Sequence, residues 1–234
     1  MPDDPVLLIT GASSGIGAAT ARRAAEAGYR MVLGARSEDR VQKLASELGG
    51  DDRAIGVRCD VGEWEDDQAL ARTALDAFGR IDAVFANAGF GAKRGFLEES
   101  PDQWRSMVLT NVLGVALTIR STLPHMLERG TGHYVLTSSI AGRRSLPGSL
   151  YSATKFAVTA MGEALRAELR QMHDNTGIRV TLIEPGMVDT EFFDERPQDA
   201  LADDDIARAV IYALSEPEHV DVNEIMIRPT SQAS

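Results

Sequence analysis

Residues 6–17 read VLLITGASSGIG, an apolar run followed directly by a turn that contains three glycines. The apolar run predicts a buried strand, and the Ala-rich stretch 18–27 behind the turn predicts a helix. Glycines at such a junction let the backbone approach a phosphate closely, and the N-terminus of the helix attracts its negative charge. The spacing G-x-x-x-G-x-G departs from the general G-x-G-x-x-G fingerprint, and the missing Gly-Lys-Ser/Thr excludes a P-loop. The segment therefore predicts a binding site for the pyrophosphate of a dinucleotide.

Short apolar runs and longer helical patterns alternate along the whole chain. Predicted strands cover residues 6–10, 30–35, 54–58, 83–86, 134–138, 180–183 and 224–228. Predicted helices cover residues 18–27, 38–48, 64–78, 103–129 (with a kink or an end near Pro124), 151–172 and 206–214. Such alternation requires crossover connections and a parallel sheet with helices on both faces. We therefore expect a single domain over residues 1–234, with an α/β fold built on a doubly wound, Rossmann-like parallel sheet.

Composition and charge exclude several classes of protein. The 234 residues include 24 Lys and Arg against 35 Asp and Glu, so the formal net charge is −11. Such a chain repels phosphate backbones and anionic lipids, so we expect no nucleic-acid partner and no membrane partner. Cys59 is the only cysteine and the four histidines lack ligand spacing, so we expect no disulfide and no metal site. We also expect no signal peptide and no apolar span of 18 residues, and hence a cytoplasmic protein.

The end of the second predicted strand bears on the choice of nucleotide. Dinucleotide-binding proteins that use NAD usually carry a carboxylate there, which accepts a hydrogen bond from the ribose 2′-hydroxyl. Here that position is Ala35, and Arg36 follows it. A guanidinium suits a 2′-phosphate, although the alternative is an ordinary solvated arginine at the start of a helix. Arg36 therefore favours NADP(H) over NAD(H).

A tyrosine and a lysine are four residues apart in the predicted helix 151–172. Tyr151 and Lys155 therefore share one face of that helix. An ammonium and an oxidised nicotinamide ring nearby both favour the phenolate, so we expect the pKa of Tyr151 to lie below its ordinary value of about 10. The spacing alone is common by chance, and it gains weight from the glycine-rich turn and from the serine pair 138–139 upstream.

Several short motifs follow one another in an order that is typical of one enzyme family. They are Thr10-Gly-x-x-x-Gly-x-Gly17, Asn87-Ala88-Gly89, Asn111, Ser138-Ser139, Tyr151-x-x-x-Lys155 and Pro185-Gly186. Together they resemble the short-chain dehydrogenase/reductase family over residues 6–190. The C-terminal stretch 222–232 is similar to that of the NADP-dependent 3-hydroxy-acid and serine dehydrogenases.

The resemblance implies a role for each motif. It implies that the catalytic residues are Asn111, Ser139, Tyr151 and Lys155. It implies that the cofactor-binding residues are Gly11, Ser13, Ser14, Gly15, Ile16, Gly17, Arg36, Asp60, Val61, Asn87, Ala88, Gly89, Tyr151, Lys155, Pro185, Gly186, Val188 and Thr190. Ser138 stays an alternative to Ser139, because its separation from the tyrosine is the commoner one in the family. Asp60 resembles the aspartate that contacts adenine, and its alternative role is to cap the helix that begins near Trp64.

The reaction implied by the resemblance transfers a hydride between NADP(H) and an alcohol/carbonyl pair. Tyr151 acts as general acid and base, and the serine holds the substrate oxygen. Lys155 tunes the tyrosine and binds the nicotinamide ribose, while Asn111 supports a water that links Lys155 to solvent. The resemblance also implies a homo-oligomer, a tetramer or a dimer, formed through the long helices.

The substrate and two competing functions stay open at this point. Candidate substrate loops are residues 90–96, 143–150 and 189–205, and their cations Lys93, Arg94, Arg143 and Arg144 either attract a carboxylate or are ordinary surface charges. The small-molecule substrate is thus a 3-hydroxy acid or a generic ketone or aldehyde. A non-catalytic, redox-responsive dinucleotide-binding module is the alternative, and the Asn–Ser–Tyr–Lys set argues against it. A methyltransferase on a similar sheet is disfavoured by the Tyr–Lys pair.

Overall fold

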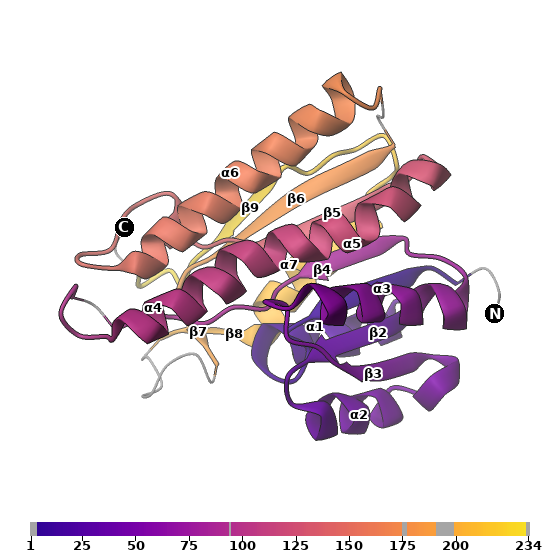
Figure 1. Ribbon diagram of the computed structural model, residues 1–234, viewed down its shortest axis with the longest axis horizontal. Helices are drawn as coiled ribbons and strands as arrows, with labels where there is room; N and C mark the ends of the chain where they lie inside the picture. Colours follow the sequence, from indigo (N-terminus) through magenta and orange to yellow (C-terminus); the bar gives the residue numbers. More distant parts are fainter. Residues whose placement is uncertain (1–3, 94, 175–176, 191–198, 233–234) are drawn as a thin grey trace.

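The centre of the molecule is a seven-stranded, all-parallel sheet in the order β3-β2-β1-β4-β5-β6-β9 (Figure 1). The computed structural model describes residues 4–93, 95–174, 177–190 and 199–232. The strands of the sheet are β1 (Val6–Thr10), β2 (Arg30–Ala35), β3 (Ala54–Arg58), β4 (Ala83–Ala86), β5 (Gly132–Thr137), β6 (Ile178–Pro185) and β9 (Glu224–Ile227). A separate parallel pair consists of β7 (Val188–Asp189) and β8 (Leu201–Ala202).

Helices cover both faces of the sheet. They are α1 (Gly15–Glu26), α2 (Glu38–Glu47), α3 (Trp64–Phe78), α4 (Pro101–Val108), α5 (Gly114–Arg129), α6 (Leu150–Gln171) and α7 (Asp203–Ser215), with short helical turns η1 (Gly50–Asp52), η2 (Leu109–Leu113) and η3 (Ile140–Gly142). The predicted single-domain, doubly wound parallel sheet of the Rossmann-like kind is therefore confirmed.

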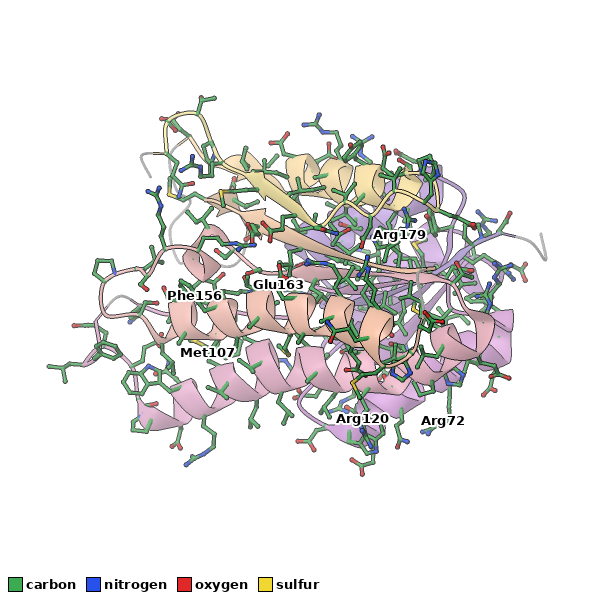
Figure 2. All side chains as sticks on the ribbon, turned by 90° about the horizontal axis from the view of Figure 1, so that it is seen from above. Arg72, Met107, Arg120, Phe156, Glu163 and Arg179 are labelled. Carbon is green, nitrogen blue, oxygen red and sulfur yellow. The ribbon has the colours of Figure 1, made fainter. Side chains whose placement is uncertain are left out.

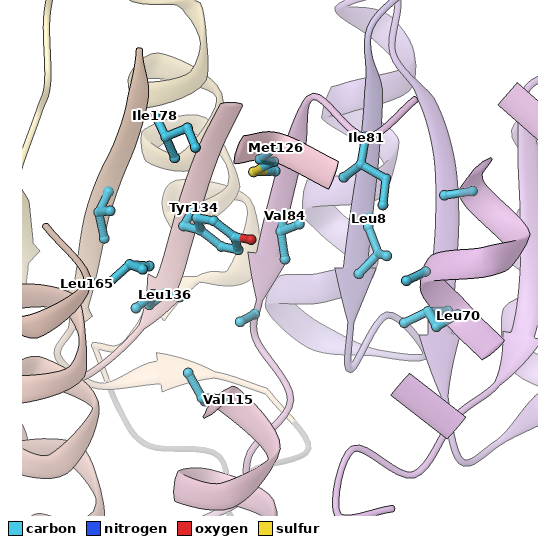
Figure 3. Packing of buried hydrophobic residues seen from close by; sticks show 14 of the residues in the cluster. Leu8, Leu70, Ile81, Val84, Val115, Met126, Tyr134, Leu136, Leu165 and Ile178 are labelled. Carbon is cyan, nitrogen blue, oxygen red and sulfur yellow. The ribbon is translucent and has the colours of Figure 1, made fainter. Parts of the chain in front are cut away.

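The apolar core lies in two clusters, one on each face of the sheet. Alternate residues of a strand point to opposite faces. In β1, Val6 and Leu8 belong to the cluster under α3, α5 and α6, whereas Leu7 and Ile9 belong to the cluster under α1, α2 and α7. Figure 3 shows the first cluster, with Leu8 and the fully buried ring of Tyr134 among its members. Burial on both faces explains why the central strands are apolar throughout rather than alternating.

The order of the strands places a crevice at one edge of the sheet. The chain moves outward from β1 through β2 to β3, and then returns to pair β4 with the other side of β1. In open parallel sheets a ligand binds at such a reversal, outside the carboxyl ends of the strands. The loops after β1, β2, β3, β4, β5 and β6 therefore meet at one place.

Two helices begin three residues earlier than the sequence predicts, the largest such differences in the fold. α1 begins at Gly15, inside the glycine-rich turn, rather than at residue 18. α7 begins at Asp203 rather than at residue 206, because Asp205 accepts a hydrogen bond from the backbone N–H of Ala202 and so caps the first turn. The polar segment 189–205 also contributes the unpredicted strands β7 and β8, while its residues 191–198 lie outside the described part of the chain.

The long helix over Pro101–Arg129 corrects two expectations. It does not end near Pro124, since α5 continues to Arg129 and closes at Gly130 with a φ of 71°. Packing of its buried side chains against the sheet outweighs the single backbone hydrogen bond that the proline removes. This helix also contains an 18-residue window with a mean hydropathy of 1.3, so it meets the length and composition test for a membrane span. The expectation of no such span was therefore wrong, although core helices of water-soluble proteins meet the same test.

Asp67 is a buried carboxylate between α3 and α5. Its side chain is 1% exposed, and the hydroxyl of Thr118 donates a 2.8 Å hydrogen bond to Oδ1, whereas Oδ2 has no partner among the described residues. Burial raises the pKa of Asp67 to about 7. The folded state therefore holds this proton more tightly than the unfolded chain does.

This shift gives the stability of the protein a definite dependence on pH. Because the folded pKa exceeds the unfolded one, the free energy of unfolding is higher when Asp67 is protonated in both states. This contribution is fully present below a pH of about 4, and it is lost as the pH rises to about 7 and Asp67 ionises in the folded state. We expect Asp67→Asn to remove that loss and to raise the free energy of unfolding at pH 8 by about 2–4 kcal/mol. Urea unfolding across this pH range measures it. Asp76→Asn, on the exposed side of the same helix, is the control and should follow the parent at every pH.

Candidate active site

The glycine-rich turn adopts a backbone that requires its glycines. Gly11 and Gly15 have φ values of 66° and 49°, which favour glycine. A Cβ at Gly11 would lie 2.8 Å from the Cα of Ala88, and a Cβ at Gly17 would collide with the carbonyl oxygen of Gly11. Gly17 therefore packs against the Gly11 backbone, where α1 passes behind the turn, and it does not line the cavity.

Asn87 and Thr10 join this turn to the neighbouring strands. The backbone N–H groups of Asn87 and Ala88 donate to the Thr10 hydroxyl at 3.1 and 3.2 Å. The Asn87 side chain donates to the carbonyl oxygens of Thr10 and Gly11, each at 3.3 Å, and accepts a hydrogen bond from the Thr137 hydroxyl at 3.2 Å. Three strand ends are thus fixed relative to one another, and the turn is rigid before any ligand arrives.

Arg36 and Asp60 lie at the other end of the crevice, beyond β2 and β3. The exposed Arg36 lines the cavity and makes no hydrogen bond or ion pair within the described part of the chain. Asp60 accepts a hydrogen bond from the backbone N–H of Gly62 at 3.1 Å, so it shapes a tight turn. The N-cap of α3 is Glu63, and therefore the alternative of Asp60 as the cap of that helix was wrong.

The two candidate serines point in different directions. The Ser138 hydroxyl is buried against α6, where it donates to the Lys155 carbonyl at 3.1 Å and pairs with the Thr159 hydroxyl at 2.8 Å. The Ser139 hydroxyl donates to the Pro185 carbonyl at 3.3 Å and is hydrogen-bonded to the hydroxyl of Tyr151. Only Ser139 therefore lies beside the phenol, which supports the choice made from the local pattern.

Tyr151 and Lys155 share one face of α6, as their spacing predicts. The Lys155 ammonium lies 5.6 Å from the centre of the Tyr151 ring and donates to the Thr137 carbonyl at 2.8 Å. Burial lowers the pKa of Lys155 to about 8, because it disfavours the charged form.

The sequence predicts a lowered pKa for Tyr151, but the surroundings of its side chain in the protein itself raise this pKa, so that prediction was wrong. Burial raises the pKa of Tyr151 to about 12, and the hydrogen bond with Ser139 opposes this by less. At neutral pH the phenol is therefore protonated, which is the form that donates a proton.

Asn111 lies in the π-helical turn η2, between α4 and α5. Its Oδ1 accepts from the backbone N–H of Phe90 at 3.0 Å, and its Nδ2 donates to the Phe90 carbonyl at 2.9 Å and to the Thr154 hydroxyl at 3.2 Å. Asn111 and Lys155 both pack against Gly89, where an added Cβ would lie 3.2 Å from the Asn111 Oδ1 and 3.6 Å from the Lys155 Nζ. Asn111 therefore ties the loop after β4 to α6 directly behind the lysine.

The remaining wall of the crevice follows β6. Gly186, Val188 and Thr190 line it, and a Cβ at Gly15 would lie 3.1 Å from the Thr190 side chain. The turn at residues 185–187 therefore lies across the opening from the glycine-rich turn.

These groups surround one cavity of about 370 Å³, a size within the range of small-ligand sites. Its lining includes every predicted site residue except Gly17 and Asn111, which support it from behind. Phe90 belongs to the predicted substrate loop 90–96, whereas sequence reasoning did not find six of the lining residues, namely Ala35, Ser37, Cys59, Thr110, Thr137 and Ser138 as a wall residue. Most of them directly adjoin predicted ones at strand ends, and that position was the available signal.

The cavity fits a dinucleotide. Residues 13–16 line the cavity at the start of α1, where the N-terminus of the helix directs backbone N–H groups outward, which suits a pyrophosphate. Arg36 and Asp60 lie at one end, and Tyr151 and Lys155 lie at the other. The residues present therefore match a ligand with an adenosine half and a reactive half.

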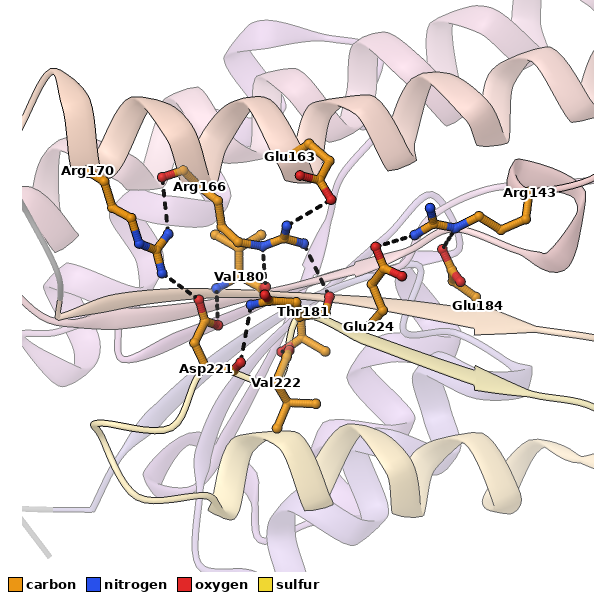
Figure 4. A network of polar contacts seen from close by, with 11 residues as sticks. Arg143, Glu163, Arg166, Arg170, Val180, Thr181, Glu184, Asp221, Val222 and Glu224 are labelled. Carbon is orange, nitrogen blue, oxygen red and sulfur yellow. Dashed lines mark hydrogen bonds and ion pairs between the residues drawn. The ribbon is translucent and has the colours of Figure 1, made fainter.

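Two of the three candidate substrate loops meet at a backbone contact. Gly95 N–H donates to the Gly148 carbonyl at 2.8 Å, so residues 90–96 and 143–150 are joined at their tips. Arg143 does not face a substrate: its guanidinium donates to Glu184 at 2.6 Å and pairs with Glu224 (Figure 4). Of the two alternatives left open for Arg143, these ion pairs disfavour the attraction of a substrate carboxylate, and Arg94 lies outside the described residues.

Comparisons with known proteins agree with this geometry. The family model described as short chain dehydrogenase matches residues 5–201. An uncharacterized oxidoreductase of Staphylococcus saprophyticus is 41% identical, over 98% of this chain and 98% of the relative.

Solved structures also superpose over nearly the whole chain. An alcohol dehydrogenase from the archaeon Thermococcus sibiricus, complexed with 5-hydroxy-NADP, matches with a TM-score of 0.90 and 34% identity over 99% of each chain. Serine dehydrogenase from Escherichia coli matches with a TM-score of 0.87 and 29% identity, over 98% of this chain and 100% of the other. Matching structures include complexes with NADP and with NAD. The chain is therefore a member of the short-chain dehydrogenase family, and it is an NAD(P)-dependent oxidoreductase.

Proposed function

We propose that this protein uses NADP(H) to interconvert a small alcohol and the corresponding carbonyl compound. The observation that carries the proposal is the Ser139–Tyr151 hydrogen bond beside the buried Lys155, in the same cavity that the glycine-rich turn lines. A non-catalytic redox-responsive module would not need this arrangement of proton-transferring groups. The bound nicotinamide cofactor supplies or accepts the hydride.

The chain's own residues handle the proton and the developing charge. In the reductive direction the protonated Tyr151 hydroxyl donates its proton to the substrate oxygen, and the Ser139 hydroxyl donates a hydrogen bond to the same oxygen. Lys155, held by the Thr137 carbonyl, supplies positive charge that stabilises the phenolate left behind. In the oxidative direction the phenolate takes the proton back. Asn111 hydrogen-bonds both to the loop that follows β4 and to α6, and it thereby fixes their relative position behind these groups.

The structural neighbours and the charges of the substrate loops bear on the substrate class. One structural neighbour is named for serine, which is a 3-hydroxy acid, whereas another is named an alcohol dehydrogenase. With Arg143 held by Glu184, the cations left for a carboxylate in the described substrate loops are Lys93 and Arg144. We therefore propose a small alcohol/carbonyl pair, with 3-hydroxy acids as one class among ketones and aldehydes. A panel of such compounds, assayed with both cofactors by the absorbance of the reduced nicotinamide, tests the proposal.

Arg36 supports NADP(H) as the cofactor. We expect Arg36→Ala to weaken NADPH binding by about 10- to 100-fold, because a guanidinium–phosphate contact is a charge-assisted hydrogen bond. NADH binding should change by less than about twofold, since a ribose hydroxyl gains little from the cation. Isothermal titration with each cofactor measures both constants. Arg40→Ala, an exposed arginine one turn further along, is the control, and an equal loss for NADPH and NADH would contradict the assignment.

The long helices offer a surface for self-association. α5 and α6 lie side by side on one face of the molecule (Figure 2), and Phe156 of α6 is exposed. Further exposed apolar area lies at the junction of α4 and α5, on Val108, Leu109 and Leu113. We propose that copies of the chain associate through this face into a dimer or a tetramer. Sedimentation equilibrium, which gives the mass of the assembly, tests this.

A further inference from the structure

The C-terminal segment lies directly against the turn that follows β6. The Gly186 N–H donates to the Ile227 carbonyl at 2.7 Å, so the ladder between β6 and β9 continues into the turn. The next N–H, that of Met187, donates at 2.9 Å to the side-chain Oε1 of Gln232. Gln232 is itself fixed, because its N–H donates to the carbonyl of the buried Pro229 at 3.0 Å.

Gln232 occupies the space that a side chain at residue 186 would need. A Cβ at Gly186 would collide with the Gln232 Oε1 and would lie 3.1 Å from the Cγ of Arg228. The φ of Gly186 does not lie in the left-handed region, so the absence of a side chain there leaves room for the Gln232 side chain rather than permitting a special backbone conformation. The contact is therefore built into the packing of the turn.

The same turn forms the wall of the cavity on the side of Tyr151. Gly186, Val188 and Thr190 line that wall, and the Pro185 carbonyl accepts the hydrogen bond of Ser139. Met187 lies between these residues, and the hydrogen bond from its N–H to Gln232 anchors the middle of the wall from outside the cavity. A shift of this turn around Met187 would therefore move the part of the wall beside Ser139 and Tyr151, which is the nicotinamide end of the proposed site.

We propose that Gln232 is a positioning residue that holds the turn at residues 185–190 in the shape that accepts the nicotinamide half of the cofactor. It touches neither cofactor nor substrate and acts through the Met187 N–H. The inference rests on the proposed NADP(H) function, and it adds that the C-terminal segment determines the geometry of one half of the site.

The test separates the two halves of the cofactor. Isothermal titration of the full chain gives Kd values for NADPH and for 2′-phospho-ADP-ribose, which lacks the nicotinamide. We expect Gln232→Ala to weaken NADPH binding by up to about tenfold, the effect of one lost hydrogen bond, and to leave 2′-phospho-ADP-ribose binding unchanged. Gln232→Glu keeps an acceptor oxygen at the same distance along the side chain and should bind both ligands like the parent. Ser231→Ala, at the exposed neighbouring position, is the matched control.

A double-mutant cycle provides a second, independent readout. The methyl group of Gly186→Ala would displace the Gln232 side chain, so this variant should lose the same hydrogen bond. Gly186→Ala combined with Gln232→Ala should therefore weaken NADPH binding by clearly less than the product of the two single effects. Multiplicative effects would contradict the shared contact.

The outcomes distinguish the two levels of the proposal. If the parent protein binds neither NADPH nor 2′-phospho-ADP-ribose, the NADP(H) function fails and the role of Gln232 fails with it. If the parent binds both, and Gln232→Ala weakens both equally or weakens neither, only the positioning role is overturned. A selective loss for NADPH that Gln232→Glu restores supports the role.

Discussion

Replacing Tyr151 by phenylalanine is expected to lower kcat by about 10²- to 10⁴-fold, the contribution of a positioned general acid or base. The change removes only the hydroxyl, so the ring keeps its packing in the first turn of α6, and Ser139 keeps its hydrogen bond to the Pro185 carbonyl. The proton of the reduced product then has to come from water. The Kd of the cofactor should change far less than kcat, because Lys155 and the glycine-rich turn are untouched.

Steady-state rates with an accepted carbonyl substrate measure the effect, and Tyr212→Phe is its control. Tyr212 is an exposed tyrosine on α7, outside the cavity lining, so its variant should turn over like the parent. A Tyr151→Phe protein that retained most of its kcat would show that another group transfers the proton. That result would leave the fold and the dinucleotide site standing but would overturn the assigned mechanism.

Arg143→Ala is expected to lower the free energy of unfolding by about 3 kcal/mol at neutral pH, because it leaves a buried carboxylate without its partner. Glu184 is 1% exposed, and its ion pair with Arg143 lies at the end of β6 (Figure 4). Burial raises the pKa of Glu184, and Arg143 opposes that shift. Without the arginine the pKa rises further. The loss of unfolding free energy in Arg143→Ala should therefore be small below a pH of about 4, where Glu184 is protonated in the unfolded chain as well. The loss should grow as the pH rises.

Two companion variants make this result specific. Arg143→Ala combined with Glu184→Gln removes both charges and should recover much of the lost stability. Arg144→Ala changes the exposed neighbouring arginine and should unfold in urea like the parent. A deficit that does not depend on pH, or an equal deficit in Arg144→Ala, would show that Glu184 is not the group left unpaired. Because Pro185 follows Glu184 and accepts the Ser139 hydrogen bond, kcat should fall together with stability.

The elements whose ends are marked locally could be predicted from the sequence. The bounds of β1, β2, β3, β4 and α3 match the structure residue for residue. α3, for example, ends at a glycine with a φ of 74°, a conformation that the sequence marks by its composition. Helix α1 begins earlier than predicted because its first turn is part of the glycine-rich segment itself, where glycines indicate a turn and not a helix. At Pro124, tertiary packing outweighed the local preference.

The candidate site shows the same division. Residues that belong to short motifs, such as Tyr151 and Lys155, line the cavity where the family pattern places them. Contacts between distant segments gave no local signal: Arg143 pairs with Glu184, and Met187 with Gln232, each more than forty positions away. The direction of the Tyr151 shift was also beyond sequence reasoning, because burial is a property of the folded molecule.

The π turn at Leu109–Leu113 also changes the rotational phase of the helix that contains it. Such a turn places one extra residue in the helical ladder, which corresponds to about 100° around the axis. A helical wheel drawn with one period over the whole of Pro101–Arg129 consequently places the side chains of α5 at the wrong angle relative to those of α4. Met107 before the turn and Val115 after it are both buried, although a uniform α-helix would set them about 80° apart around the axis. A deletion of one residue should accordingly be tolerated better within this turn than in the regular part of the helix, because it would convert the turn into α-helix and leave the later side chains of α5 facing the sheet.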